Sequence, residues 1–126
     1  MVSRLVVVVI DAVDPELVAE FWCAVLGWQV VEREADLIGI GPQDGSWPRI
    51  DIAAVPEAKT IKNRLHLDLR AEGVSTEAEL ARLESLGARR VDVGQGPEVS
   101  WVVLADPEGN EFCLLSRPVE EVTRGT

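Results

Sequence analysis

The first half of the chain alternates short apolar runs with one amphipathic segment. The β-branched run at 5–10 is bounded by polar residues, which is typical of a buried strand. Residues 14–16, Asp-Pro-Glu, form a helix start with an acidic N-cap, and Gly27 is placed to end that helix. Its apolar stripe consists of Val18, Phe21, Trp22, Val25 and Leu26. Further strands are predicted at 28–34, 37–40 and 49–55.

The same order of elements restarts after a polar linker at 56–63. Residues 64–71 alternate strictly between apolar and polar side chains, which predicts a half-buried strand. Thr76 and Glu79 form a T-x-x-E capping box for a second helix, which Gly87 is placed to end. Residues 106–109 predict a type I turn, with proline second and glycine fourth. The remaining strands are predicted at 90–93, 99–104 and 111–116.

The two predicted helix ends, Gly27 and Gly87, lie 60 residues apart, and the first strands keep the same offset. We therefore predict one α+β domain, 1–126, made by duplication of a βαβββ unit. A sheet with a helix on one face leaves its other face uncovered, so two such units can shelter a cleft. A ferredoxin-like dimeric barrel is disfavoured, because it needs a βαββαβ order. The modules are expected at about 4–55 and 63–116, followed by a frayed polar tail at 117–126.

Strand alternation predicts which side chains face this cleft. If Leu65, Leu67 and Leu69 pack under the helix, the opposite face carries His66, Asp68 and Arg70. In the last strand, Phe112 and Leu114 fall on the helix side, whereas the cleft side carries Glu111, Cys113 and Leu115. At the 60-residue offset, the first strand contributes an apolar wall of Val6, Val8 and Ile10.

Composition narrows the function. The formal net charge of the 126-residue chain is −10, so nucleic acid is not an expected partner and an anionic membrane offers no attraction. No apolar stretch approaches the ~20 residues of a membrane span and no signal peptide is evident, so a cytoplasmic location is expected. Two cysteines, Cys23 and Cys113, do not make a disulfide framework.

Rare residue types limit the chemistry further. His66 is the only histidine, which excludes a two-histidine metal site within one chain. Tyrosine is absent, which excludes a tyrosine as a catalytic acid. Asp68 could orient or charge His66 as a general base, or pair with Arg64 or Arg70. Cys113 is either a small buried hydrophobe or a nucleophile that only His66 could activate.

Two further groups of side chains belong to the predicted cleft. Trp47 and Trp101 lie on or beside its flanking strands, where they either contact a flat ligand or belong to the core. Lys59, Lys62 and Arg64 form a basic cluster that is either a solvated linker or an attraction for an anionic ligand.

Five short motifs, in this order and spacing, support a family resemblance: DPELVAEFW at 14–22, LGW at 26–28, KNRLHLD at 62–68, LGA at 86–88 and LADPEGNEF at 104–112. They resemble the vicinal oxygen chelate superfamily of glyoxalase I, bleomycin-resistance proteins and extradiol dioxygenases, and most of all small bacterial glyoxalase-like domain proteins. The resemblance covers roughly residues 4–116. It implies that the two βαβββ modules pair into a half-open barrel and that the chain forms a homodimer.

The resemblance also implies a metal-ligand set in metal-dependent members: His on the first strand, Glu or Gln on the fourth, His on the fifth and Glu on the eighth. In this chain these positions fall on Val6 or Val7, near Asp51 or Ala53, on His66 and on Cys113. A valine side chain has no atom that can bind a metal ion, so we expect a largely degraded metal site without a cofactor. The alternative is a three-ligand zinc or iron site of His66, Cys113 and Asp51.

Two functions follow as hypotheses. In the first, the chain binds a small, partly aromatic organic molecule without turnover. In the second, it is a metal-dependent lyase or isomerase of the glyoxalase I type, or a dioxygenase, with His66 as metal ligand or base. The predicted ligand-binding residues are His66, Asp68, Trp47, Trp101, Asp51, Cys113, Val6 and Val8.

Overall fold

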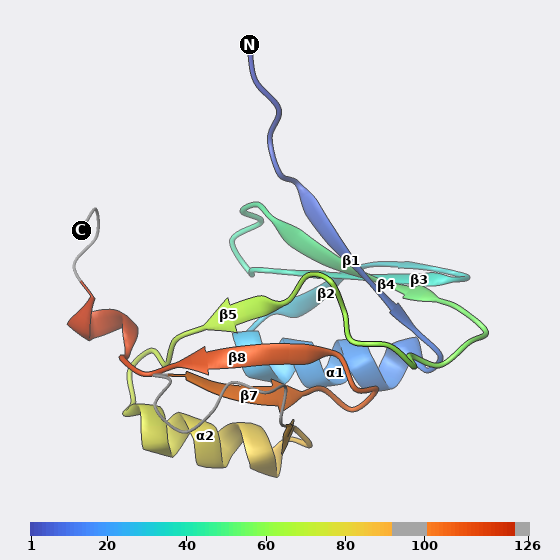
Figure 1. Cartoon of the computed structure of the whole chain (residues 1–126). Helices are drawn as coiled ribbons and strands as arrows, with labels where there is room; N and C mark the ends of the chain where they lie inside the picture. Colours follow the sequence, from blue (N-terminus) through green and yellow to red (C-terminus); the bar gives the residue numbers. More distant parts are fainter. Residues whose placement is uncertain (92–100, 123–126) are drawn as a thin grey trace. The chain divides into compact units, whose positions relative to one another are not determined.

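The structure is a computed structural model that describes residues 1–91 and 101–122. The chain divides into two compact units, residues 1–58 and 59–126. The described residues of each unit form one α-helix and one four-stranded sheet in the order βαβββ (Figure 1). This confirms the α+β class and the two modules, whereas their pairing into a half-open barrel stays a prediction.

The first unit forms a mixed sheet. Its strands lie in the order β1-β4-β3-β2, with β1 parallel to β4 and the other neighbours antiparallel. The boundaries agree with the predicted ones to within a few residues. The elements are β1 (Val7–Ala12), α1 (Pro15–Leu26), β2 (Gln29–Glu34), β3 (Leu37–Gly41) and β4 (Arg49–Ala54).

The signals at both ends of α1 are confirmed. The Asp14 carboxylate accepts a hydrogen bond from the Leu17 N–H at 3.2 Å, and Pro15 is the first helical residue. Gly27 follows the helix with a φ of +68°, a left-handed conformation that glycine adopts without strain. The predicted stripe faces the core: Val18, Phe21, Trp22 and Val25 are buried.

Strand register separates a core face from an open face in the first sheet. Ile50 and Ile52 pair with Ile40 and Ile38, and all four are buried. Side chains of paired residues point to the same side of a sheet. Because Val8 pairs with Ile50 and Ile10 pairs with Ile52, Val8 and Ile10 belong to the core face.

The predicted apolar wall of Val6, Val8 and Ile10 is therefore wrong by one position. Val7 and Val9 occupy the open face, where they pair with Arg49 and Asp51. The reason is the offset between the units: Val8 and Ile10 share the core face with their partners, as Leu67 and Leu69 do in the second unit, so the first strands are related by an odd number of residues rather than by 60. A slip of one residue moves every side chain of a strand to the other face.

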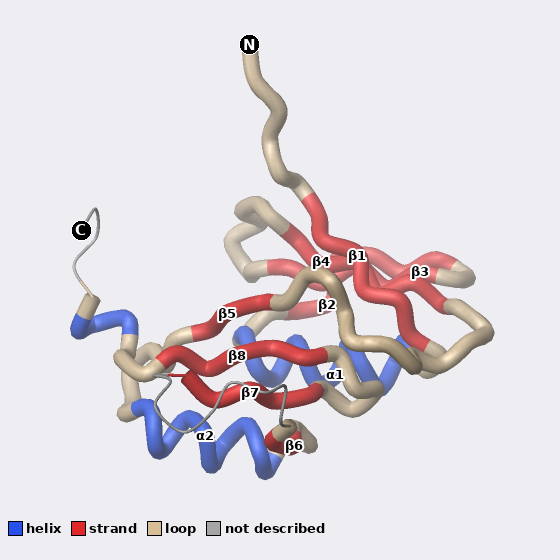
Figure 2. The backbone as a smooth tube through the Cα atoms, in the orientation of Figure 1, coloured by secondary structure: helices blue, strands red, loops and turns tan. Residues whose placement is uncertain are grey.

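The second unit has the same topology, with its strands in the order β5-β8-β7-β6 (Figure 2). Strand β5 is parallel to β8. The strand expected at 64–71 is much shorter than predicted. Parts of two predicted strands, 92–93 and 99–100, lie outside the described residues. The elements are β5 (Leu67–Leu69), α2 (Thr76–Ser85), β6 (Arg89–Arg90), β7 (Trp101–Ala105), β8 (Glu111–Leu115) and the 3-10 helix η1 (Val119–Glu121).

The core face of the second sheet largely follows the predicted alternation. Phe112 and Leu114 are fully buried, and they pair with Leu67 and Leu69 of β5. Leu65 does not join them, because it precedes the strand and is 86% exposed, which corrects the prediction that it packs under the helix.

The predicted turn between β7 and β8 is confirmed. The Gly109 N–H donates to the Asp106 carbonyl at 2.9 Å, which closes a four-residue turn. Asp106 is fully buried, and its carboxylate accepts from the N–H groups of Glu108 and Asn110, both at 2.9 Å. The hydrogen bonds of this turn therefore fix the positions of Asn110 and Glu111.

Residues 117–122 are attached to the second unit, which corrects the expectation of a frayed tail for this segment, whereas residues 123–126 lie outside the described residues. The Val119 N–H donates to the Ala71 carbonyl at 2.7 Å, and the Gly73 N–H donates to Glu120 at 2.9 Å. Arg70 donates to the Arg117 carbonyl at 3.0 Å. This contact directs Arg70 to the C-terminal segment instead of the predicted cleft.

The cap of α2 also differs from the prediction. Ser75, with extended backbone angles, accepts from the Ala78 N–H at 3.1 Å, so Ser75 is the N-cap. Thr76 is already helical, and its hydroxyl donates to the Ser116 carbonyl at 2.9 Å. Glu79 pairs with Arg82 at 2.8 Å instead of completing a capping box.

Among the described residues, no helix is long and apolar enough to cross a membrane.

Replacing Ser75 with alanine should lower the free energy of unfolding by about 1 kcal/mol, because the Ala78 N–H loses its partner. Urea denaturation of the full chain measures this loss. Ser75→Gly is the matched control, since glycine at an N-cap costs only a few tenths of a kcal/mol. Equal losses in the two variants would contradict this role of Ser75.

Candidate functional site

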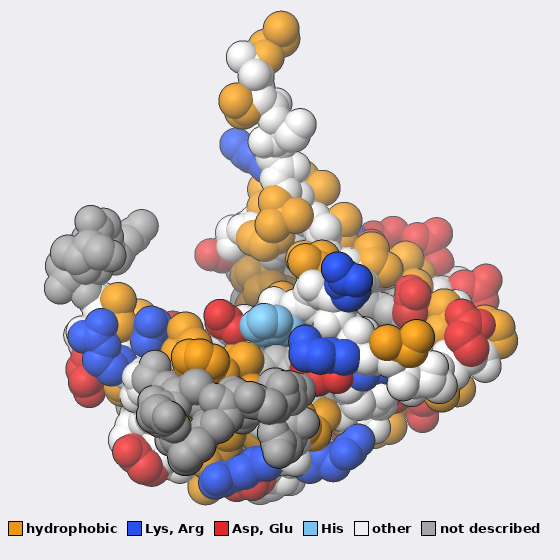
Figure 3. Space-filling view, in the orientation of Figure 1, with side chains coloured by type: hydrophobic (Ala, Val, Ile, Leu, Met, Phe, Trp, Pro, Cys, Tyr) orange, Lys and Arg blue, Asp and Glu red, His pale blue; other side chains and the backbone are white. Residues whose placement is uncertain are grey.

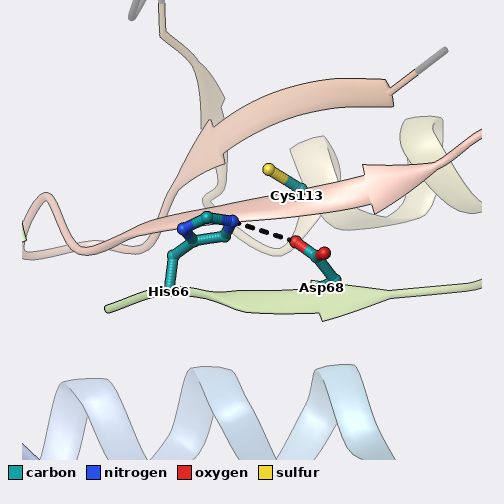
Figure 4. A group of neighbouring side chains, drawn as sticks. All are labelled: His66, Asp68 and Cys113. Carbon is teal, nitrogen blue, oxygen red and sulfur yellow. Dashed lines mark ion pairs between the residues drawn. The ribbon is translucent and has the colours of Figure 1, made fainter. Parts of the chain in front are cut away.

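The pairing of β5 with β8 creates the site. Asp68 pairs with Cys113, whereas the flanking pairs Leu67–Phe112 and Leu69–Leu114 point to the core. Strand alternation therefore puts Asp68 and Cys113 on the open face. His66 precedes Asp68 by two positions, and its side chain joins them (Figure 4).

His66, Asp68 and Cys113 form a compact cluster. The His66 Nε2 lies 3.1 Å from the Asp68 carboxylate. One nitrogen, one carboxylate oxygen and the Cys113 sulfur all lie within 4.8 Å of one another. The two polar side chains are about half exposed, whereas Cys113 is buried. The only histidine of the chain is visible at the surface in Figure 3.

This cluster opens into a cavity of about 310 Å³, which lies at the small end of the range for organic ligands. The apolar part of its lining consists of Trp101, Val103 and Leu115, together with the Cys113 thiol. The polar part consists of Lys62, His66, Asp68 and Glu111. All eight residues belong to the second unit.

Cys113 is a protonated thiol at neutral pH. Burial raises its pKa, and the Asp68 carboxylate raises the pKa further through its charge and by accepting a hydrogen bond from the thiol. Lys62 acts in the opposite direction, and the balance raises the pKa to about 11. Because the thiolate is the nucleophilic form, Cys113 is a weak nucleophile in this environment.

The Glu111 carboxylate is ionised, and each of its oxygens accepts a hydrogen bond. The carboxylate accepts from Lys59 at 2.8 Å and from the Asn63 N–H at 3.1 Å. Partial burial alone would raise the pKa of Glu111, but these hydrogen bonds outweigh it, so the pKa is lowered.

The structure brings together four of the predicted site residues, His66, Asp68, Trp101 and Cys113, around one cavity. Their role as ligand contacts stays a prediction. The other four belong to the first unit: Trp47 is 53% exposed in the β3–β4 loop, and Val6 is 40% exposed before β1. Val8 lies on the core face, and the Asp51 carboxylate lies 3.5 Å from Arg49.

Sequence reasoning missed two parts of this site. Val103 pairs with Cys113 across β7 and β8, and strand alternation would have placed it there had the register been known. Asn63 binds Glu111 across 48 positions of sequence, and no local pattern signals such a contact.

The donor set suits a borderline or soft metal ion rather than Mg²⁺, which prefers oxygen ligands. Imidazole, carboxylate and thiolate are all zinc ligands, and bonds of about 2.0–2.3 Å to one ion are compatible with donors this close. The cluster contains Asp68 in the place predicted for Asp51. On the open face of β1, Val7 offers no donor, as the resemblance implied.

Comparisons with known proteins agree with this architecture. The profile of the glyoxalase-like domain family matches residues 7–115. The chain is similar in structure to a glyoxalase/bleomycin resistance protein/dioxygenase family enzyme from Burkholderia phytofirmans PsJN, with a TM-score of 0.63, 22% identity, and coverage of 89% of this chain and 97% of that one. No curated protein sequence matches significantly.

Two other solved structures show the same fold. The fosfomycin resistance protein FosX from Listeria monocytogenes is similar with a TM-score of 0.71 and 14% identity, covering 96% of each chain. A glyoxalase-related enzyme from Fulvimarina pelagi is similar with a TM-score of 0.67 and 17% identity, covering 90% of this chain and 88% of that one.

The fold that the chain shares with these solved structures consists of two βαβββ modules. The chain belongs to the glyoxalase-like domain family.

Alkylation tests the electrostatics of Cys113. In a Cys23→Ser chain freed of metal by a chelator, the rate of reaction with iodoacetamide should rise with pH toward a midpoint of about 11. Asp68→Asn removes the charge that holds the proton on sulfur, so the midpoint should move to lower pH. Glu77→Gln, which removes an exposed acid at the start of α2, is the control. A parent midpoint at the ordinary thiol value of 9.0, or no shift in Asp68→Asn, would contradict the assignment.

Proposed function

We propose that this chain binds a small, partly aromatic organic molecule in the cavity of its second unit and holds it without chemical turnover. The observation that carries the proposal is the cavity itself, which is lined by apolar Trp101, Val103 and Leu115 together with polar Lys62 and His66. Apolar walls with a few polar groups are typical of sites that bind and orient organic ligands.

The state of the reactive groups favours binding over catalysis. The Cys113 thiol keeps its proton, and both oxygens of Glu111 are occupied. Asp68 is shared between His66 and the Cys113 thiol. Among the solved relatives, FosX is described as a fosfomycin resistance protein. A protein that sequesters a ligand is consistent with such a relative.

A metal-dependent enzyme is the second candidate, favoured by the three donor atoms within 4.8 Å. His66, Asp68 and Cys113 would hold the ion, and the ion would polarise a ligand oxygen as a Lewis acid.

The expected homodimer and cytoplasmic location belong to this proposal as well. Light scattering coupled to gel filtration tests the dimer.

Calorimetric titration with three bicyclic probes tests the proposed function: 2-naphthoate, 2-naphthamide and 2-naphthylmethylammonium. At least one should bind saturably, and Trp101→Ala should weaken it by about tenfold, because truncation removes the largest apolar surface of the cavity. Trp101→Phe should retain part of the affinity. No binding by any probe, or affinity indifferent to Trp101, would contradict the proposal.

Metal analysis of untagged protein separates the two candidates. Binding without turnover predicts probe affinity that is unchanged by a chelator and by added zinc. Stoichiometric zinc, nickel or iron that is lost in both His66→Ala and Cys113→Ser would instead establish the second candidate.

A further inference from the structure

The segment that leads into β5 is attached to the sheet beside the cavity. We call residues 59–64 the strap. Lys59 donates to Glu111 at 2.8 Å, and the Asn63 N–H donates to the other oxygen of the same carboxylate at 3.1 Å. The Asn63 side-chain amide donates to Asn110 at 2.8 Å. Glu111 and Asn110 therefore hold the strap at both of its ends.

This attachment is more than a surface ion pair. The Lys59 and Glu111 side chains are only 19% and 13% exposed, so water competes weakly for their contact. Asn110 is itself held by the buried Asp106, whose carboxylate accepts from the Asn110 side chain at 3.0 Å. The strap is thus anchored to a rigid turn, and its position is determined by the fold of the second unit.

Lys62 lies between the two anchored ends and lines the cavity. Of the described residues that line the cavity, Lys62 is the only lysine or arginine, and none of the described residues forms an ion pair with it. Its ammonium group makes one long hydrogen bond, 3.4 Å, to the neighbouring Asn63 carbonyl. The carboxylates of Asp68 and Glu111 already have partners. Within the described part of the chain, the cavity therefore has one lysine without a carboxylate partner, which can bind an anionic ligand.

We propose that the ligand is an anion, that Lys62 receives its acidic group, and that the attachment of the strap to Glu111 places Lys62 for this contact. The inference rests on the proposed function and specifies its ligand class: a carboxylate with a planar apolar part. The net charge of −10 disfavours long-range attraction of anions, so recognition depends on this local contact. Lys62 is a binding residue, and Glu111 is a positioning residue that acts through it.

The three naphthalene probes test the charge preference. The native chain should bind 2-naphthoate more tightly than 2-naphthamide, which has the same shape without the charge. Lys62→Met should weaken 2-naphthoate by about tenfold and leave 2-naphthamide within about twofold, because only the charged contact is lost. Lys62→Arg should restore most of the affinity for 2-naphthoate.

Glu111→Gln tests the positioning role. Glutamine keeps an acceptor for Asn63 but loses the ion pair with Lys59, so 2-naphthoate should bind about fivefold more weakly. In a Lys62→Met chain, Glu111→Gln should weaken the binding of 2-naphthoate by less than about a further twofold, because it affects binding only through the position of Lys62. Glu84→Gln is the matched control, since Glu84 forms an exposed pair with Arg90 on the same unit.

Hydrogen exchange supplies a readout that needs no ligand. The amides of residues 59–64 should exchange faster in Glu111→Gln than in the native chain or in Glu84→Gln. Unchanged exchange would overturn the positioning role.

The outcomes separate the two proposals. If none of the probes binds, the proposed function fails and this inference falls with it. If 2-naphthamide binds as tightly as 2-naphthoate, if the cationic probe binds best, or if Lys62→Met affects all probes alike, the inference alone is overturned.

Discussion

The register between β5 and β8 is the constraint on which the site depends. The pair Asp68–Cys113 lies between two apolar pairs that enter the core, so a slip of one residue in β5 would bury the Asp68 carboxylate and a slip of one residue in β8 would expose Phe112. Burial of Phe112 and Leu114 therefore determines where Asp68 and Cys113 point. The hydrophobic core of the second unit and the chemistry of its open face are two results of one pairing.

How far the sequence predicted this arrangement depends on how local each signal is. The Asp14 cap, the Gly27 helix end and the turn at 106–109 are encoded within a few residues, and all three were predictable. The cap of α2 was misassigned because Ser75 and Thr76 are adjacent hydroxyl residues, and only the backbone angles of Ser75 identify it as the cap. Alternation around His66 placed Asp68 and Cys113 together, but it extended the strand too far and assigned Leu65 to the core.

Non-local features were harder to predict. The helix ends suggested an offset of 60, whereas strand pairing requires an odd offset, and this difference alone moved Val8 from the open face to the core. The attachment of Asn63 and Lys59 to Glu111 joins positions about fifty residues apart, and depends on how the turn presents Glu111. The basic cluster at 59–64 was visible in the sequence, but only contacts distinguish the paired Lys59 from the available Lys62.

The central claim is that the open face of the second sheet is a ligand site, and methyl NMR tests it most directly. Val103 and Leu115 line the cavity, whereas Leu69 and Leu114 lie on the core face of the same sheet. During titration with 2-naphthoate, the account predicts that the methyl signals of Val103 and Leu115 shift while those of Leu69 and Leu114 stay in place. Shifts confined to the core-face methyls, or spread evenly over both faces, would contradict it.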